Sequence, residues 1–435
     1  MDGAMSSAPS SNAPRRPWMA TAIWGWRVEL ALAIGTLFVL SISTRIGSIG
    51  PVLAAVIALV VLKQRPAIRQ NLNRQMQTNR EHRWLHAALW QCAIIGRNGS
   101  TPKVLRSASL PVGRRYLLRL PIGLHAELLQ RSCLELAAAL GVREVRVKAS
   151  PVNTSYVELV VIRTSAFPQS LRSGLVNQRQ ISLWEPLVLG VGNDGLAVTI
   201  GLPEHNLLIG GEPGSGKSVA LSTIVAAAAL DPSVNLTLID GKYVELMAWM
   251  DVADEFVGAS QEDAVRVLET LRVVMDSRYE VLANNRRRKM TQDDPEGLHV
   301  LVIDELAFFL RGGDKQLRER FAELLRDLVS RGRAAGIIVV ATTQKPSHEI
   351  VPTWIRDLFS YRLAMRCTSS DSSDTILGQG WASQGFSAAT IDPSTRGVGY
   401  LLAEGSVPAL IMTPFLSDEE IELIALRAFE LRFWQ

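Results

Sequence analysis

The sequence predicts an α/β nucleotide-binding domain in the C-terminal part of the chain, preceded by a small α+β domain and a helical hairpin. Two observations predict the nucleotide-binding domain. Residues 211–218, Gly-Glu-Pro-Gly-Ser-Gly-Lys-Ser, match the phosphate-binding pattern G-x-x-x-x-G-K-[ST] between an apolar strand and a helical run. Continuous apolar runs at 236–239, 300–303 and 337–341 alternate with helical patterns, which is typical of a parallel sheet buried on both faces.

The composition limits the class of protein. A chain of 435 residues has room for two or three domains. Its 3 cysteines lie far apart without C-x-x-C spacing, which argues against a disulfide framework and fits a reducing cytoplasm. The net charge is only +4, but the segment from Lys63 to Arg119 carries twelve lysines and arginines and one acid, Glu81. That segment is expected to lie beside an anionic partner, either lipid headgroups or nucleic acid.

The N-terminal region predicts a membrane anchor. Residues 1–27 begin with a Ser-, Ala- and Pro-rich stretch that predicts disorder. Two uncharged runs, 30–44 and 46–62, then flank Arg45 and predict a transmembrane helical hairpin over 28–63, although both are shorter than the roughly 20 residues that span a bilayer comfortably. Positive residues on both sides of the hairpin predict that both termini lie in the cytoplasm and that the protein sits in the cell membrane. A buried hairpin of a soluble domain stays open as the alternative.

Residues 64–102 are interpreted as a basic connector, and residues 103–164 as a small α+β domain. Within that domain, apolar patterns predict strands at 116–120, 142–147 and 156–161, together with a helical stripe from Leu124 to Leu140. No catalytic set is visible in it, so a role in assembly is expected.

A polar linker is predicted over 165–185 and the nucleotide-binding domain over 186–435. Short strands are predicted at 187–189 and 197–200, ahead of the phosphate loop. Near the end of the domain, Ser417 and Glu420 form a capping box that predicts the start of a last helix.

The phosphate loop predicts how ATP and Mg²⁺ bind. Its glycines allow backbone N–H groups to turn towards phosphate oxygens, and the following helix points its positive end at the same anion. Lys217 is expected to reach the β- and γ-phosphates, and the Ser218 hydroxyl to bind Mg²⁺. The predicted nucleotide-binding residues are Gly211, Glu212, Pro213, Gly214, Ser215, Gly216, Lys217, Ser218 and Val219.

A Walker B pattern ends the apolar run at residues 298–305. Asp304 is expected to hold Mg²⁺ through the water shell of the metal, because Mg²⁺ prefers one or two carboxylates plus phosphates. Glu305 is expected to orient and polarise the attacking water. Together with the phosphate loop, these acids predict a hydrolysing P-loop ATPase.

Two further residues complete the predicted catalytic set. Gln344 follows the next apolar strand and could sense the γ-phosphate; an ordinary capping role is the alternative. Arg333 lies between Walker B and that strand, where an arginine can be offered to the ATP of a neighbouring subunit. For this arginine, a solvated salt bridge is the alternative.

Several segments in the right order resemble the motor domain of the FtsK/SpoIIIE family of DNA translocases. They are residues 206–219, 238–246, 276–279, 302–305, 333–346, 361–365 and 374–377. The resemblance implies a RecA-like P-loop ATPase motor domain, a homo-hexameric ring around double-stranded DNA, and a trans-acting role for Arg333. The short apolar runs followed by a basic module look most like the compact transfer proteins of actinobacterial plasmids and integrative conjugative elements.

Two basic clusters are candidates for DNA contact, because a motor that ignores sequence needs cations directed at phosphates. They are Arg286, Arg287, Arg288 and Lys289 in the first, and Arg311 and Lys315 in the second. A solvated surface is the alternative for both.

The predicted function is therefore that of a membrane-anchored, ATP-driven DNA translocase in conjugative transfer. The alternatives are chromosome segregation, a type VII-like protein-secretion ATPase and a non-catalytic assembly factor; intact Lys217, Asp304 and Glu305 argue against the last. Related translocases end in a winged-helix domain that reads DNA signals, and only the capped helix follows Leu416. Sequence-directed loading is therefore expected to need a partner.

Overall fold

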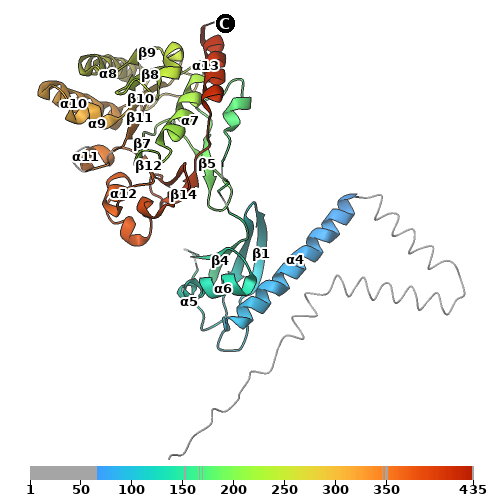
Figure 1. Cartoon of the computed structure of the whole chain (residues 1–435). Helices are drawn as coiled ribbons and strands as arrows, with labels where there is room; N and C mark the ends of the chain where they lie inside the picture. The colour runs from blue at the N-terminus through green and yellow to red at the C-terminus, as the bar shows by residue number, and fades with distance from the viewer. Residues whose placement is uncertain are drawn as a thin grey trace, which may run out of the picture. The chain divides into compact units, whose positions relative to one another are not determined.

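A computed structural model describes residues 66–150, 153–165, 167–168, 170–344, 346–347 and 351–433. The chain divides into two compact units, residues 1–165 and 166–435, each considered by itself (Figure 1). The predicted disordered segment at 1–27 and the predicted hairpin at 28–63 lie outside the described residues. Among the described helices, none combines the length and apolarity needed to cross a membrane.

The first unit is a four-stranded antiparallel sheet, in the order β1-β2-β4-β3, with helices packed on it. Its elements are α4 (Pro66–Gln91), β1 (Lys103–Leu110), β2 (Gly113–Arg119), α5 (Ala126–Arg131), α6 (Cys133–Leu140), β3 (Glu144–Ala149) and β4 (Tyr156–Ile162). The three predicted strands are present as β2, β3 and β4, whereas β1 was not predicted. The predicted helical stripe is two helices that meet at Ser132, and Gly141 ends the second in a left-handed conformation.

The sequence predicts a basic connector over 64–102, separate from this domain. That boundary is wrong, because α4 belongs to the core of the domain. Leu85 and Leu89 of α4 are fully buried against a cluster that includes Tyr116 and Leu118. Glu81, on the same helix, is buried and paired with Arg114 and with Arg163, whose Nη2 lies 3.1 Å from Glu81 Oε1. The lone acid of the basic segment thus holds α4 to the sheet.

The second unit contains a ten-stranded sheet with helices on both faces (Figure 1). Its strand order is β6-β5-β14-β13-β12-β7-β11-β10-β8-β9. The strands are β5 (Leu187–Gly192), β6 (Ala197–Ile200), β7 (Leu207–Gly210), β8 (Asn235–Asp240), β9 (Glu255–Val257), β10 (His299–Asp304), β11 (Ile337–Thr343), β12 (Tyr361–Met365), β13 (Val398–Leu402) and β14 (Ala409–Met412). The principal helices are α7 (Lys217–Ala229), α8 (Gln261–Asn284), α9 (Leu306–Arg311), α10 (Lys315–Arg331), α11 (Thr353–Arg356), α12 (Ser370–Leu377) and α13 (Asp418–Phe433).

The central strands run parallel, which determines where the site lies. β7 pairs with β11, β11 with β10, and β10 with β8, all in parallel. All six predicted strands of this domain are found, as β5, β6, β7, β8, β10 and β11. Figure 1 shows α8 and α10 on one face of the sheet and α7 and α13 on the other, each over its own apolar core. The carboxyl ends of the parallel strands therefore meet at one edge, where ligands bind in open α/β sheets.

The predicted polar linker at 165–185 also differs from the structure, because part of it packs on this unit. It contains the short helix η1 (Gly174–Asn177), and both Leu175 and Leu183 are buried in the core. The Leu183 N–H donates to Asp231 Oδ2 at 2.7 Å. The folded unit therefore begins before residue 186.

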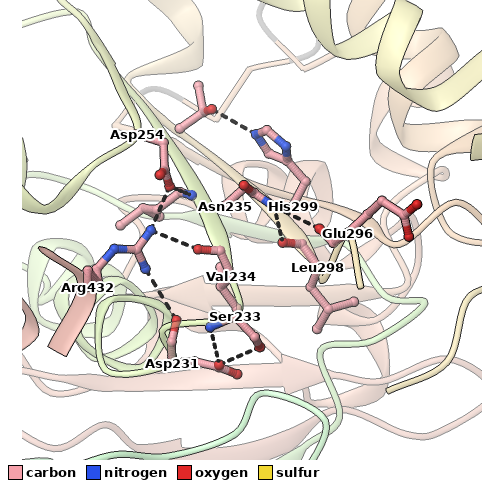
Figure 2. Close-up of polar contacts among 11 residues, drawn as sticks. Asp231, Ser233, Val234, Asn235, Asp254, Glu296, Leu298, His299 and Arg432 are labelled. Atoms are coloured by element: carbon pink, nitrogen blue, oxygen red, sulfur yellow. Dashed lines mark hydrogen bonds and ion pairs between the residues drawn. The ribbon is translucent and has the colours of Figure 1, made fainter. Parts of the chain in front are cut away.

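The last helix, α13, is attached at both ends. The predicted capping box is confirmed: Ser417 N donates to Glu420 Oε2 at 2.9 Å, and Glu420 N donates to Ser417 Oγ at 3.3 Å. At the other end, Arg432 donates to the carbonyl of Val234 at 2.8 Å and forms a 2.6 Å ion pair with Asp254 (Figure 2). Arg432 thereby ties α13 to the chain that enters and flanks β8.

Candidate active site

The phosphate loop joins β7 to α7 in a conformation that requires glycine. Gly214 and Gly216 have φ values of 75° and 105°, which side chains rarely allow. A Cβ atom on Gly216 would also lie 2.7 Å from the backbone of Gly397, so the loop is packed against a neighbouring strand connection. The motif therefore folds as the sequence predicts, with α7 beginning at its end.

Lys217 is held inside this loop. Its side chain is largely buried, and Nζ donates to the Glu212 carbonyl at 3.1 Å. Burial lowers the pKa of Lys217, while Glu305 opposes that shift. The Ser215 hydroxyl is buried without a hydrogen-bond partner among the described residues. Such an orphaned donor beside the N-terminus of a 13-residue helix suits a phosphate ligand.

Asp304 ends β10, next to the end of β11. Its Oδ1 accepts a hydrogen bond from Thr342 Oγ1 at 2.6 Å, whereas its buried Oδ2 has no partner among the described residues. Burial raises the pKa of Asp304, and the Thr342 hydrogen bond opposes that shift. A buried carboxylate oxygen without a donor fits a hydrated Mg²⁺, since the metal or its waters would satisfy it.

Glu305 adopts a left-handed backbone conformation, with φ 57° and ψ 69°, at the start of α9. For a residue with a side chain this conformation costs about 1–3 kcal/mol, and such residues cluster at functional sites. Oε1 accepts from the Gln344 N–H at 3.3 Å and lies 3.4 Å from Thr343 Oγ1. Oε2 accepts from Lys242 Nζ at 2.7 Å. Both oxygens of this acid are therefore bound by the protein.

The loop after β8 supplies the site residues that the sequence analysis missed. Asp240 is fully buried and accepts hydrogen bonds from the N–H groups of Lys242, Val244 and Leu246, each at 3.0 Å. This arrangement holds Lys242 beside Glu305. The run 238–246 was noted only as part of the family resemblance, and nothing local in it indicates that a lysine reaches a carboxylate 63 positions away.

The five predicted catalytic residues are not all brought together. Lys217, Asp304 and Glu305 lie at the carboxyl edge of the sheet, and Gln344 joins them through its backbone N–H. Arg333 instead precedes the amino end of β11, at the opposite edge. Its Nε donates to the Glu204 carbonyl at 2.5 Å, and Nη2 lies 3.2 Å from Glu404.

The first basic cluster, residues 286–289, lies at the same edge as Arg333. Arg287 is engaged by Asp294 through two contacts of 2.5 Å, which lower the pKa of Asp294 to about 2. Lys289 pairs with Glu204 at 2.5 Å, while Arg286 and Arg288 are exposed. Half of this cluster is thus committed to contacts within the chain.

The second basic cluster lies at the other end of α8. Gln261, the first residue of α8, donates to the Gly312 carbonyl at 2.6 Å and so holds the turn between Arg311 and Lys315. Lys315 and Glu319 lie 3.7 Å apart and are both exposed, so their pairing contributes little. Because α8 separates the two clusters, they do not form one continuous surface.

Comparisons with known proteins agree with this architecture. Residues 179–384 match the FtsK/SpoIIIE family model. The DNA translocase FtsK of Listeria monocytogenes is 27% identical over 336 residues, covering 72% of this chain and 43% of that protein. Its counterpart in Staphylococcus aureus is 27% identical over 314 residues, covering 66% and 38%. The chain thus spans less than half the length of these curated relatives.

Two solved structures share the fold. The pCW3 conjugation coupling protein TcpA, in its monomer form with ATPγS, superposes with a TM-score of 0.55 at 18% identity, covering 80% of this chain and 98% of that one. EssC (ATPases 2 and 3) from Geobacillus thermodenitrificans has a TM-score of 0.51 at 13% identity, covering 61% and 52%. Residues 179–384 are therefore similar to the FtsK/SpoIIIE family, and they carry the phosphate loop and the paired acids that are typical of a P-loop ATPase.

Proposed function

We propose that this protein is a membrane-anchored, ATP-driven translocase of double-stranded DNA that works as a homo-hexameric ring. The observation that carries the proposal is the separation between the phosphate-binding residues and Arg333. Lys217 and Glu305 lie at the carboxyl edge of the sheet, and Arg333 is 39% exposed at the amino edge. A second subunit that docks this edge against the nucleotide would supply the missing cation, as in other phosphoryl-transfer enzymes.

The residues present suit ATP and Mg²⁺. Lys217 and the N–H groups of the phosphate loop would bind the phosphates, and Ser218 with Asp304 would hold the metal. The bound metal would neutralise the charge of the phosphates. Glu305 would orient the attacking water, and Gln344 would respond to the γ-phosphate.

DNA as the cargo is supported by the curated relatives, which are DNA translocases. In a ring, exposed cations such as Arg286 and Arg288 or the turn from Arg311 to Lys315 would contact phosphates without reading sequence. The second cluster is the better candidate, because it follows β10 and α9 directly and hydrolysis at Glu305 could move it.

Conjugative transfer is the proposed task. The solved conjugation coupling protein is matched over 98% of its own length, whereas the curated FtsK relatives are matched over less than half of theirs. Chromosome segregation is one alternative task for a DNA translocase. Type VII-like protein secretion is the other alternative, favoured by the shared fold of EssC.

The decisive test is ATP hydrolysis by the full chain in detergent, with and without duplex DNA, at low and high salt. Lys217→Ala serves as the blank. We expect strong stimulation by duplex DNA that fades as salt rises, since phosphate contacts release counterions. An ATPase that forms rings and yet ignores DNA would overturn the proposed cargo and favour secretion.

Membrane anchoring and ring formation need separate measurements. Membranes from expressing cells should retain the full chain after a high-salt wash, whereas a chain lacking residues 1–65 should be released. Mass photometry of the full chain with ATPγS should show hexamers. Release of the full chain by salt would argue against an inserted hairpin.

A further inference from the structure

Lys242 forms a direct ion pair with Glu305, the acid predicted to polarise water. The two atoms, Nζ and Oε2, lie 2.7 Å apart, and the side chains are 34% and 10% exposed respectively. Charge-assisted hydrogen bonds of this length are among the stronger ones in proteins, and the partial burial of the pair limits screening by solvent.

The two neighbouring acids differ in what binds them. Asp304 keeps its Oδ2 without a partner among the described residues, so it is available to a metal or its waters. Glu305 has no such oxygen, because Lys242 binds Oε2 while Gln344 N–H binds Oε1. A carboxylate whose two oxygens already accept hydrogen bonds from the protein is less able to orient a water molecule. In this subunit Asp304 therefore has an oxygen available for a metal or its waters, whereas both oxygens of Glu305 are bound by the protein.

The position of Lys242 is set by a hydrogen-bonded loop. The carboxylate of Asp240, fully buried, binds three backbone N–H groups between residues 242 and 246. The short helix η2 (Met247–Val252) follows and is anchored by fully buried Trp249. The hydrogen bonds to Asp240 fix the backbone on both sides of Lys242 and keep its side chain beside Glu305.

We propose that Lys242 is a positioning residue that restrains Glu305 and thereby limits ATP hydrolysis by the unassembled subunit. The restraint rests on contacts within one subunit, and its effect on hydrolysis rests on the proposed ATPase function of this site.

The test measures ATP hydrolysis by the Lys242→Met variant and by the unchanged protein. Both are kept without DNA and at protein concentrations too low for rings to form. Methionine keeps the length of the side chain and removes its charge. We expect kcat to rise about fivefold at unchanged KM for ATP. A fivefold change in rate corresponds to the free energy of one partly exposed ion pair, which the variant no longer has to break. Lys242→Arg should stay near the starting protein, because the charge is retained.

The matched control is Arg266→Ala. It removes another ion pair of the same domain, in which Arg266 Nη1 lies 3.0 Å from Glu255 Oε1, and which is not part of the candidate active site. It should leave kcat unchanged. A lower kcat in Lys242→Met would overturn the proposal and make Lys242 necessary for chemistry. A higher KM with constant kcat would make it a phosphate ligand, and an unchanged rate would make the pair structural.

A second measurement does not depend on turnover. In a double-mutant cycle, the effects of Lys242→Met and Glu305→Gln on the midpoint of urea unfolding should not be additive if the pair exists in solution. Additive effects would contradict it. Neither measurement uses DNA. If DNA does not stimulate ATP hydrolysis, the proposed cargo is refuted, but the proposed restraint of Glu305 by Lys242 is not.

Discussion

The Thr342 hydroxyl holds Asp304 across two neighbouring strands, with 2.6 Å between Thr342 Oγ1 and Asp304 Oδ1. Thr342 Oγ1 also accepts a hydrogen bond from the Glu305 N–H at 3.3 Å. One side chain at the end of β11 thus orients both acids that end β10. The relative positions of Asp304 and Glu305 therefore depend on the pairing of β10 with β11.

Replacing Thr342 by valine should disturb this arrangement. The change leaves a buried carboxylate oxygen without its donor, which should lower the free energy of unfolding by about 1–3 kcal/mol and reduce ATP turnover. Urea denaturation and steady-state kinetics measure the two effects. Thr343→Val is the neighbouring control: it removes only the 3.4 Å contact to Glu305 and should cost less. Equal effects of both changes would argue against a special role for Thr342.

Lys217→Ala and Glu305→Gln should each abolish ATP turnover and leave the fold intact. Both side chains act on phosphates and water and not on the apolar core, so circular dichroism should not change. Glu305→Gln is also expected to retain ATP binding, which equilibrium binding of a fluorescent ATP analogue would measure. Turnover near that of the starting protein in either variant would refute the site.

Arg333→Ala should lose hydrolysis and retain nucleotide binding. If Arg333 acts on a neighbour's ATP, mixing Arg333→Ala subunits with Lys217→Ala subunits should restore part of the activity, because some interfaces regain both residues. Absence of complementation would favour the alternative, in which the exposed contact with Glu404 is a surface salt bridge of little value.

His299 should make the nucleotide-binding domain less stable in acid. Burial, with the charge of Arg278, lowers the pKa of His299 to about 3, and its Nε2 lies 2.8 Å from Thr237 Oγ1. Between that value and the ordinary 6.5, the unfolded chain binds a proton that the folded protein does not, so stability falls as pH falls. The slope should approach about 1.4 kcal/mol per pH unit. His299→Gln should flatten the pH dependence of the urea midpoint; the same slope in both proteins would assign it elsewhere.

Arg432→Met should loosen α13. The arginine side chain is 5% exposed and donates to the Asp231 and Val234 carbonyls and to Asp254 (Figure 2). Its loss should lower the free energy of unfolding by about 2 kcal/mol, since the hydrogen bonds involve a charged group. Arg172→Met is the matched control at the other end of the helix, where the arginine is 80% exposed in its pair with Glu420. That change should have almost no effect on the urea midpoint.

The sequence by itself determined the motifs and strands that are formed by residues adjacent in the chain. The phosphate loop needs eight consecutive residues, the capping box at Ser417 needs four, and β8, β10 and β11 are continuous apolar runs. Each follows from local sterics, hydrogen bonding or burial pattern. Lys217, Asp304 and Glu305 were identified for the same reason.

Only the tertiary structure decided which distant residues meet. Lys242 reaches Glu305, and Thr342 reaches Asp304, because β8, β10 and β11 lie side by side, and strand order is set by contacts far apart in the sequence. The position of Arg333 at the opposite edge follows from the direction of β11. The packing of α4 on the first sheet also escaped prediction, because its basic residues conceal the apolar positions that tertiary contacts bury.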